Sequence, residues 1–106
     1  MMVEELKILF KPVLSKTAAQ KVYLFGSMAK GTADEYSDVD LVIVADTDRP
    51  FVERFKDFMG LLKVSPAAVE MLVYTKDEFK RMRERGNGFI QNVLEEGKIL
   101  YERSSA

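Results

Sequence analysis

The chain has 106 residues, 47% of them hydrophobic, and a formal net charge of −1 from 16 basic and 17 acidic residues. These values predict a single domain, residues 1–106, without the basic excess that direct nucleic-acid binding by bulk electrostatics requires. The absence of Cys and His excludes disulfides, thiolate and Ser-His-Asp catalysis and nearly every zinc site, and the absence of a long apolar run predicts a cytoplasmic protein with no membrane partner.

The first predicted element is an amphipathic helix over about residues 3–18, where apolar residues recur at helical spacing. Pro12 lies inside this stretch and has no backbone N–H to donate, so we expect a kink or a break there. A short strand over residues 22–25 follows, and Gly26 ends it.

The turn after this strand carries groups that suit a phosphate. Gly26 and Ser27 can offer backbone N–H groups and a hydroxyl at the start of a short helix over residues 27–30. Lys30 can add positive charge to such a site, although it can equally be an ordinary exposed loop lysine.

A polar loop leads to a second strand over residues 39–45, and two aspartates, Asp38 and Asp40, stand at its beginning. On a strand, residues i and i+2 point to the same face, roughly 6.5–7 Å apart. Like charges that close repel unless a cation or a proton lies between them, and Mg²⁺ or Mn²⁺ is the oxygen-preferring cation that fits. The alternative is an ordinary turn with a solvated acidic pair.

A helix is predicted after residue 48, with Asp48 as its cap and Pro50 in its first turn. Apolar residues then trace one helical face over three turns, which favours core packing over a ligand pocket. They are Phe51, Val52, Phe55, Phe58, Met59 and Leu62.

The third predicted strand covers residues 69–74 and carries Glu70 near its beginning, in a stretch otherwise suited to burial. Glu70 can be a third carboxylate of a metal site, or a surface glutamate at a strand edge. A capping box, Thr75 to Glu78, opens the next helix, whose later arginines we expect on a solvated face. A final short helix and a strand over residues 98–101 complete the pattern.

The positions of these residues predict the directions in which the strands of the sheet run. Asp38 and Asp40 can meet Glu70 only if the second and third strands run parallel, and the connection between these strands is long enough for a right-handed crossover. Gly26 and Ser27 reach the same place only if the first strand runs antiparallel to the second. The predicted fold is therefore α/β, with a mixed sheet and helices packed on it.

The motif Gly26-Ser27, then Gly31, then Ser37-Asp38-Val39-Asp40-Leu41 resembles the signature of the DNA polymerase β-like nucleotidyltransferase superfamily. The length of the chain and the details of the motif resemble its minimal nucleotidyltransferase branch, whose members are commonly encoded next to HEPN-domain proteins. The resemblance implies ATP as substrate and two Mg²⁺ ions, with Mn²⁺ as an alternative, held by Asp38, Asp40 and Glu70. The family usually has Asp where this chain has Glu70, which puts turnover in question.

The leading hypothesis is an enzyme that transfers AMP from ATP to a hydroxyl of a partner protein, as the antitoxin of a HEPN toxin–antitoxin pair. The resemblance implies a tyrosine near the RNase site of the partner as the acceptor. A rival hypothesis is a non-catalytic antitoxin of the same fold that sequesters its partner. A third is a small-molecule nucleotidyltransferase that acts with a detached acceptor subunit.

Overall fold

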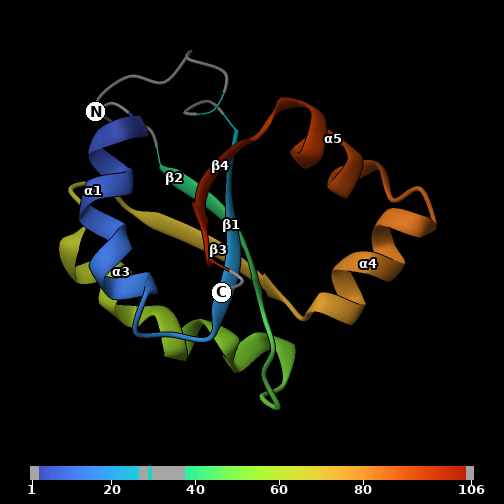
Figure 1. Ribbon diagram of the computed structural model, residues 1–106, viewed down its shortest axis with the longest axis horizontal. Helices are drawn as coiled ribbons and strands as arrows, with labels where there is room; N and C mark the ends of the chain where they lie inside the picture. The colour runs from blue at the N-terminus through green and yellow to red at the C-terminus, as the bar shows by residue number, and fades with distance from the viewer. Residues whose placement is uncertain (1–2, 27–28, 30–37, 105–106) are drawn as a thin grey trace.

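The computed structural model describes residues 3–26, 29 and 38–104, which form a four-stranded sheet with helices on both faces (Figure 1). The strand order is β3-β2-β1-β4. The strands are β1 (Ala19–Phe25), β2 (Val39–Ala45), β3 (Val69–Tyr74) and β4 (Lys98–Glu102).

The sheet is mixed, as predicted. Strand β1 runs antiparallel to both β2 and β4, whereas β2 and β3 run parallel in an unbroken register from Val39 opposite Val69 to Val44 opposite Tyr74. The chain between β2 and β3 passes through a 3-10 helix, η1 (Phe51–Phe58), and helix α3 (Met59–Val64). A parallel pair needs such a crossover, because a tight turn can join only antiparallel neighbours.

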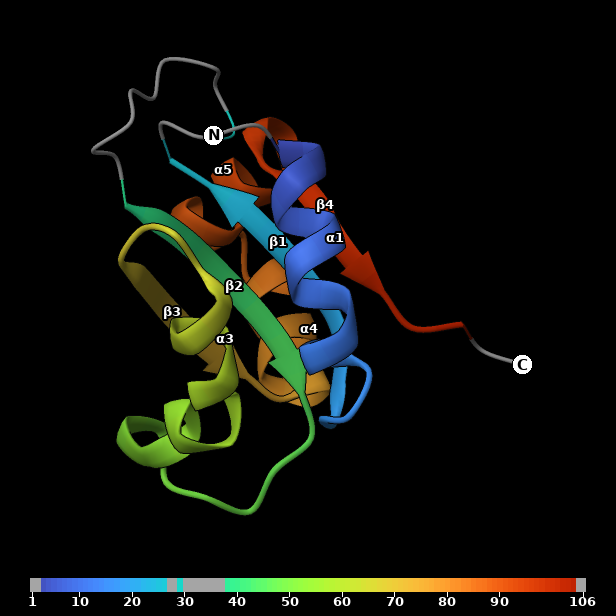
Figure 2. The same ribbon diagram turned by 90° about the vertical axis from the view of Figure 1, so that its left-hand side faces the viewer.

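Helix α1 (Val3–Leu14) and α3 cover one face of the sheet (Figure 2). Helix α1 continues through Pro12 and ends four residues earlier than predicted. The hydroxyl of Thr17 donates to Leu14 O at 2.7 Å and accepts from Ala19 N at 3.2 Å. This local turn replaces further helical hydrogen bonds and directs the chain into β1.

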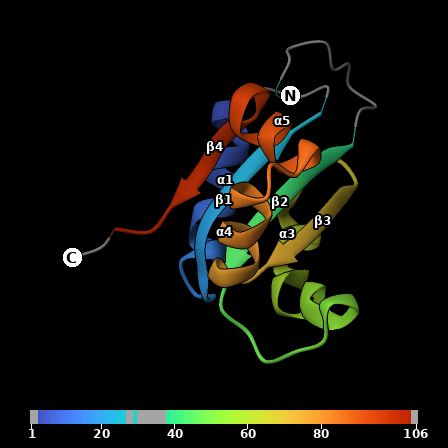
Figure 3. The ribbon, with the colours of Figure 1, turned by 90° about the vertical axis from the view of Figure 1, so that its right-hand side faces the viewer.

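Helices α4 (Lys76–Glu84) and α5 (Gly88–Glu96) cover the opposite face (Figure 3). The predicted capping box is present, since Thr75 accepts from the backbone N–H of Glu78 and the Glu78 side chain accepts from that of Thr75. Strand β2 is therefore covered on both faces, and its residues 41–45 are all buried. No helix in the described part of the chain is long and apolar enough to cross a bilayer.

The prediction for the segment after residue 48 was wrong in two respects. Pro50, not Asp48, occupies the N-cap, and it makes no side-chain cap hydrogen bond. Most of the apolar face predicted to be core is instead exposed, up to 76% for Val52, and only Phe58 of that set is buried. The stretch is not the single α-helix that the prediction assumed, because it forms the 3-10 helix η1 as far as Phe58 and the short helix α3 from Met59. The exposed members of that set are Phe51, Val52, Phe55, Met59 and Leu62.

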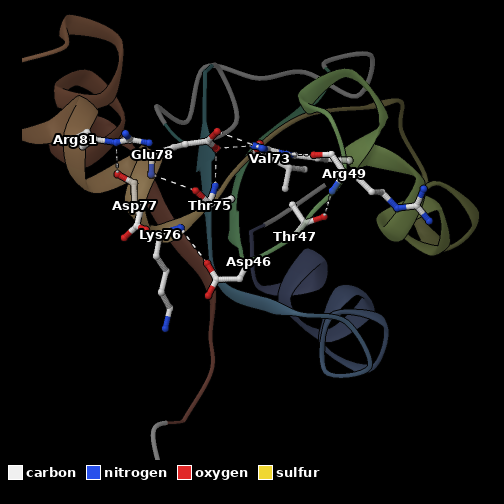
Figure 4. A network of polar contacts seen from close by, with 10 residues as sticks. Asp46, Thr47, Arg49, Val73, Thr75, Lys76, Asp77, Glu78 and Arg81 are labelled. Carbon is white, nitrogen blue, oxygen red and sulfur yellow. Dashed lines mark hydrogen bonds and ion pairs between the residues drawn. The ribbon is translucent and has the colours of Figure 1, made fainter.

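Arg54 takes a buried position in η1, where it is 8% exposed. Its guanidinium donates to Glu78 Oε1 at 2.5 Å and to Glu78 Oε2 at 3.2 Å, and also to Val73 O at 3.1 Å and Arg49 O at 3.0 Å (Figure 4). A buried charge is tolerated when it is paired and hydrogen-bonded in this way. The network ties η1 to β3 and to the start of α4.

Candidate functional site

Three strand ends meet at one edge of the sheet. Asp40 on β2 lies opposite Phe25, the last residue of β1, and opposite Glu70 near the start of β3. The backbone N–H of Val39 donates to Ala68 O at 2.8 Å, which joins β2 to the chain just before β3. The parallel register thus brings Asp40 and Glu70, 30 positions apart in the sequence, to neighbouring places on adjacent strands.

Asp40 and Glu70 stand side by side on the paired strands, with Asp40 half-buried and Glu70 exposed. Burial raises the pKa of Asp40, and hydrogen bonding and charge from Glu70, with the charge of Asp38, raise that pKa further. Carboxylates that lie close together repel each other, and a cation between them relieves this repulsion. An all-oxygen donor pair of this kind fits a hard cation such as Mg²⁺ or Mn²⁺.

Gly26 lies directly against this pair. Its φ is +77°, and a Cβ added to it would stand 2.6 Å from Asp40 Oδ2. The left-handed backbone and the close approach each favour glycine over any other residue. The end of β1 therefore presents its main chain to the acidic edge without a side chain between them.

Asp38 lies just before β2 and is exposed. It is close enough for its charge to act on Asp40. Within residues 3–26, 29 and 38–104, no three acidic side chains gather closely enough to enclose a metal ion. The described arrangement is thus a neighbouring pair, Asp40 and Glu70, with the exposed Asp38 near Asp40.

Two of the predicted phosphate-binding residues, Ser27 and Lys30, lie outside the described residues, as do Gly31 and Ser37 of the motif. Ala29, which is described, is buried in the core. The contact between Gly26 and Asp40 was not predicted from the sequence. A glycine at the end of a strand that pairs with the aspartate-bearing strand was the available signal.

The chain is similar to known proteins in its sequence and in its fold. Residues 9–106 match the sequence family described as Polymerase beta, Nucleotidyltransferase. A Methanocaldococcus jannaschii protein, provisionally named a protein adenylyltransferase, is 37% identical over 82 residues, which cover 77% of this chain and 78% of that protein.

Solved structures share the fold. A toxin–antitoxin crystallised with AMP-PNP superposes with a TM-score of 0.66 at 22% identity, covering 92% of this chain and 74% of that one. A Shewanella oneidensis complex, described as a tri-AMPylated HEPN toxin with an MNT antitoxin, superposes with a TM-score of 0.61 at 19% identity, covering 96% and 74%. The likeness to these two structures concerns the arrangement of strands and helices.

Proposed function

The chain belongs to the polymerase β nucleotidyltransferase family, and we propose that it transfers AMP from ATP, with Mg²⁺, to a hydroxyl of a partner protein in the cytoplasm. The name of the M. jannaschii relative supports adenylyl transfer to protein. The AMP-PNP in one structural neighbour supports an adenine nucleotide as the donor.

The observation that carries the proposal is the pairing of Asp40 with Glu70 on adjacent parallel strands, with the bare main chain of Gly26 against Asp40. In this proposal Asp38, Asp40 and Glu70 hold Mg²⁺. When bound, Mg²⁺ lowers the pKa of the attacking hydroxyl and neutralises the charge that develops on the leaving pyrophosphate.

The remaining roles fall to groups at the end of β1. Backbone N–H groups at Gly26 and Ser27, with the Ser27 hydroxyl, hold the β- and γ-phosphates, and Lys30 adds positive charge there. This places the α-phosphorus at the acidic edge. The acceptor oxygen forms a bond to that phosphorus, the bond to pyrophosphate breaks, and the hydroxyl proton passes to a carboxylate or to water.

We propose a HEPN-domain protein as the acceptor, with a tyrosine near its RNase site as the modified residue. The Shewanella complex, in which a HEPN toxin carries AMP beside an MNT antitoxin, supports this choice. Attached AMP puts a negative phosphate and a bulky base where RNA must bind, so it blocks the RNase by charge and by steric exclusion.

A second candidate is a non-catalytic antitoxin that sequesters the same partner. Two observations favour it: glutamate stands at position 70, and the described part of the chain gathers a carboxylate pair rather than a cluster of three. Glutamate has one more methylene than aspartate, so its carboxylate sits on a longer and more flexible stem.

Pyrophosphate release separates the two candidates. The purified chain is mixed with the product of the neighbouring gene, ATP, and either Mg²⁺ or EDTA. The proposal requires release with Mg²⁺ that is lost in Asp38→Asn and kept in Glu95→Gln, an exposed acidic residue of α5. Binding of the partner without any pyrophosphate release would support the sequestering antitoxin instead.

A further inference from the structure

A hollow of about 330 Å³ lies between the sheet and α4, at the opposite end of the sheet from the acidic edge. Lys21 in its lining pairs with Val44, whereas Phe25, four residues further along β1, pairs with Asp40. At about 3.3 Å per residue, these two places are separated by roughly 13 Å along the strand. The hollow is therefore distinct from the carboxylate site.

Basic side chains enter this hollow from two walls. Lys76, Lys80 and Arg83 project from α4, and their i, i+4 and i+7 spacing puts them on one side of the helix. Lys21 comes from β1, and Arg103 follows the end of β4. Cations on two facing walls can both contact one compact anion. A flat row of cations would instead suit an extended polyanion.

Few acidic groups neutralise these cations. Glu102 is the one acidic residue in the lining, and its carboxylate lies 3.1 Å from Lys21 Nζ with the Glu102 side chain 59% exposed. Arg103 donates to main-chain oxygens, at 2.7 Å to Thr17 O and 2.9 Å to Ala19 O, so its charge has no carboxylate partner in the part of the chain that the structure describes. The lining therefore keeps an excess of four positive charges.

The Lys76 ammonium can also bind an anion in this hollow. Figure 4 shows the Lys76 side chain extending away from the polar network at the start of α4, in which its backbone N–H donates to Asp46 Oδ1 at 3.3 Å. Lys80 and Arg83 make no ion pair with another described residue and are exposed. Unpaired ammonium and guanidinium groups are the donors that bind phosphate oxygens best.

The floor of the hollow is aromatic but largely covered. Tyr23 and Phe79 stack with ring centroids 5.6 Å apart, and they are only 6% and 7% exposed. Little ring surface remains for a nucleobase to stack on. Recognition in this hollow therefore depends on negative charge rather than on a base.

We propose that this hollow binds a compact polyphosphate anion, the chemistry shared by free tripolyphosphate and by the phosphate tail of a nucleoside triphosphate. The net charge of −1 for the whole chain conceals this local excess of positive charge. The proposal does not depend on the transfer activity, because no residue of the hollow belongs to the acidic edge.

Calorimetry of the whole chain in EDTA, with tripolyphosphate and with ATP in separate titrations, tests the proposal. Lys80→Ala/Arg83→Ala removes two cations of the α4 wall and should weaken binding about tenfold or more. The matched control is Arg81→Ala/Arg85→Ala, which removes the same charge from α4 at residues that line a different hollow. It should weaken binding by no more than about threefold.

Lys80→Ala/Arg83→Ala should weaken metal-free binding by the same factor in the Asp40→Asn background as in the parent, which separates the hollow from the acidic edge. Equal affinity for tripolyphosphate and ATP would assign recognition to the phosphates, and tighter binding of ATP would make the nucleotide the source. The proposal is overturned if neither anion saturates or if both double variants weaken binding equally. The proposal is also overturned if a short single-stranded RNA binds more tightly than tripolyphosphate and both double variants weaken the binding of RNA. Melting curves of Lys80→Ala/Arg83→Ala should match the parent, since Lys80 and Arg83 are exposed and make no ion pair with a described residue; the control variant also loses the hydrogen bond from Arg81 Nε to Asp77 O.

Discussion

The main chain of Gly26 lies against the carboxylate of Asp40, so closely that a Cβ on Gly26 would stand 2.6 Å from Asp40 Oδ2. The φ of Gly26, +77°, is also one that other residues rarely adopt. This relationship ties the residue that follows β1 to the first acidic residue of β2, and it makes Gly26 a direct test of the site.

Gly26→Ala should lower the free energy of unfolding by about 1–2 kcal/mol through backbone strain alone, and it should displace the Asp40 carboxylate. Urea unfolding measures the first effect, and the rise in Tm on adding Mg²⁺ measures the second. Gly88→Ala is the control, because a Cβ at Gly88 has no atom within 4 Å. A Gly26→Ala protein with the stability and Mg²⁺ response of the parent would contradict the described contact.

Asp40→Asn should raise the metal-free stability at neutral pH. The folded protein raises the pKa of Asp40, chiefly by burial and then by Glu70 and Asp38. The ionised carboxylate therefore destabilises the fold at pH values above the raised pKa, and this cost disappears as the pH falls below the ordinary value of about 3.9. Asparagine removes the cost, so the gain in Tm should be present at pH 7 and absent near pH 3.

The gain in stability on adding Mg²⁺ tests the same carboxylates in a second way. The parent should gain stability with Mg²⁺ because the cation offsets the repulsion between Asp40 and Glu70, whereas Asp40→Asn should gain little. A lower metal-free Tm at pH 7 for Asp40→Asn, or a Mg²⁺ response equal to that of the parent, would argue against the carboxylate pair as a cation site.

Glu78→Gln should lower the stability at neutral pH, where Asp40→Asn raises it. The hydrogen bonds from Arg54 hold the pKa of Glu78 below its usual range, so the ion pair stabilises the fold above the ordinary carboxyl pKa and stops doing so as the pH falls through the lowered value. At pH 7 the substitution should cost about 2 kcal/mol, since the buried Arg54 loses its charged partner and one of the two side-chain oxygens to which it donates. Glu84→Gln, an exposed change on the same helix, should cost almost nothing. Equal losses for the two variants would contradict this account of Arg54.

Glu70→Gln should reduce transfer more than ATP binding, because in the proposed mechanism Glu70 serves the metal at the attacking hydroxyl. Glu70→Asp restores the residue usual in the family and should raise turnover if glutamate limits it. Steady-state kinetics and ATP titration in parallel separate kcat from affinity. If neither substitution changes the rate, the exposed Glu70 takes no part in transfer and the site needs another carboxylate.

The sequence predicted the orientation of strands better than the packing of the crossover. Apolar runs and the need to gather Asp40 and Glu70 were enough to place β2 and β3 parallel, and the Thr75–Glu78 capping box is a local signal that the structure confirms. The prediction for the crossover failed because it assumed one continuous α-helix, whereas the chain forms the 3-10 helix η1 followed by α3. The burial of Arg54 depends on Glu78, 24 residues away, and no local pattern reveals that pairing.

Some features of the candidate site could likewise be predicted from the sequence, and others could not. The register of Asp40 with Glu70 follows from strand direction and could be predicted. The contact of Gly26 with Asp40 could not, because it depends on the backbone angle of one residue and on the side-chain direction of another. Predictions for Ser27 and Lys30 stay predictions, since these residues lie outside the described part of the chain.

The intact mass of the partner tests the central claim most directly. The chain is expressed together with the product of its chromosomal neighbour, the neighbour is purified, and its mass is measured. The account predicts a gain of one or more AMP units that disappears when the chain carries Asp38→Asn or Asp40→Asn and persists with Glu95→Gln. An unmodified partner held in a tight complex would contradict AMP transfer and leave sequestration as the function of this fold.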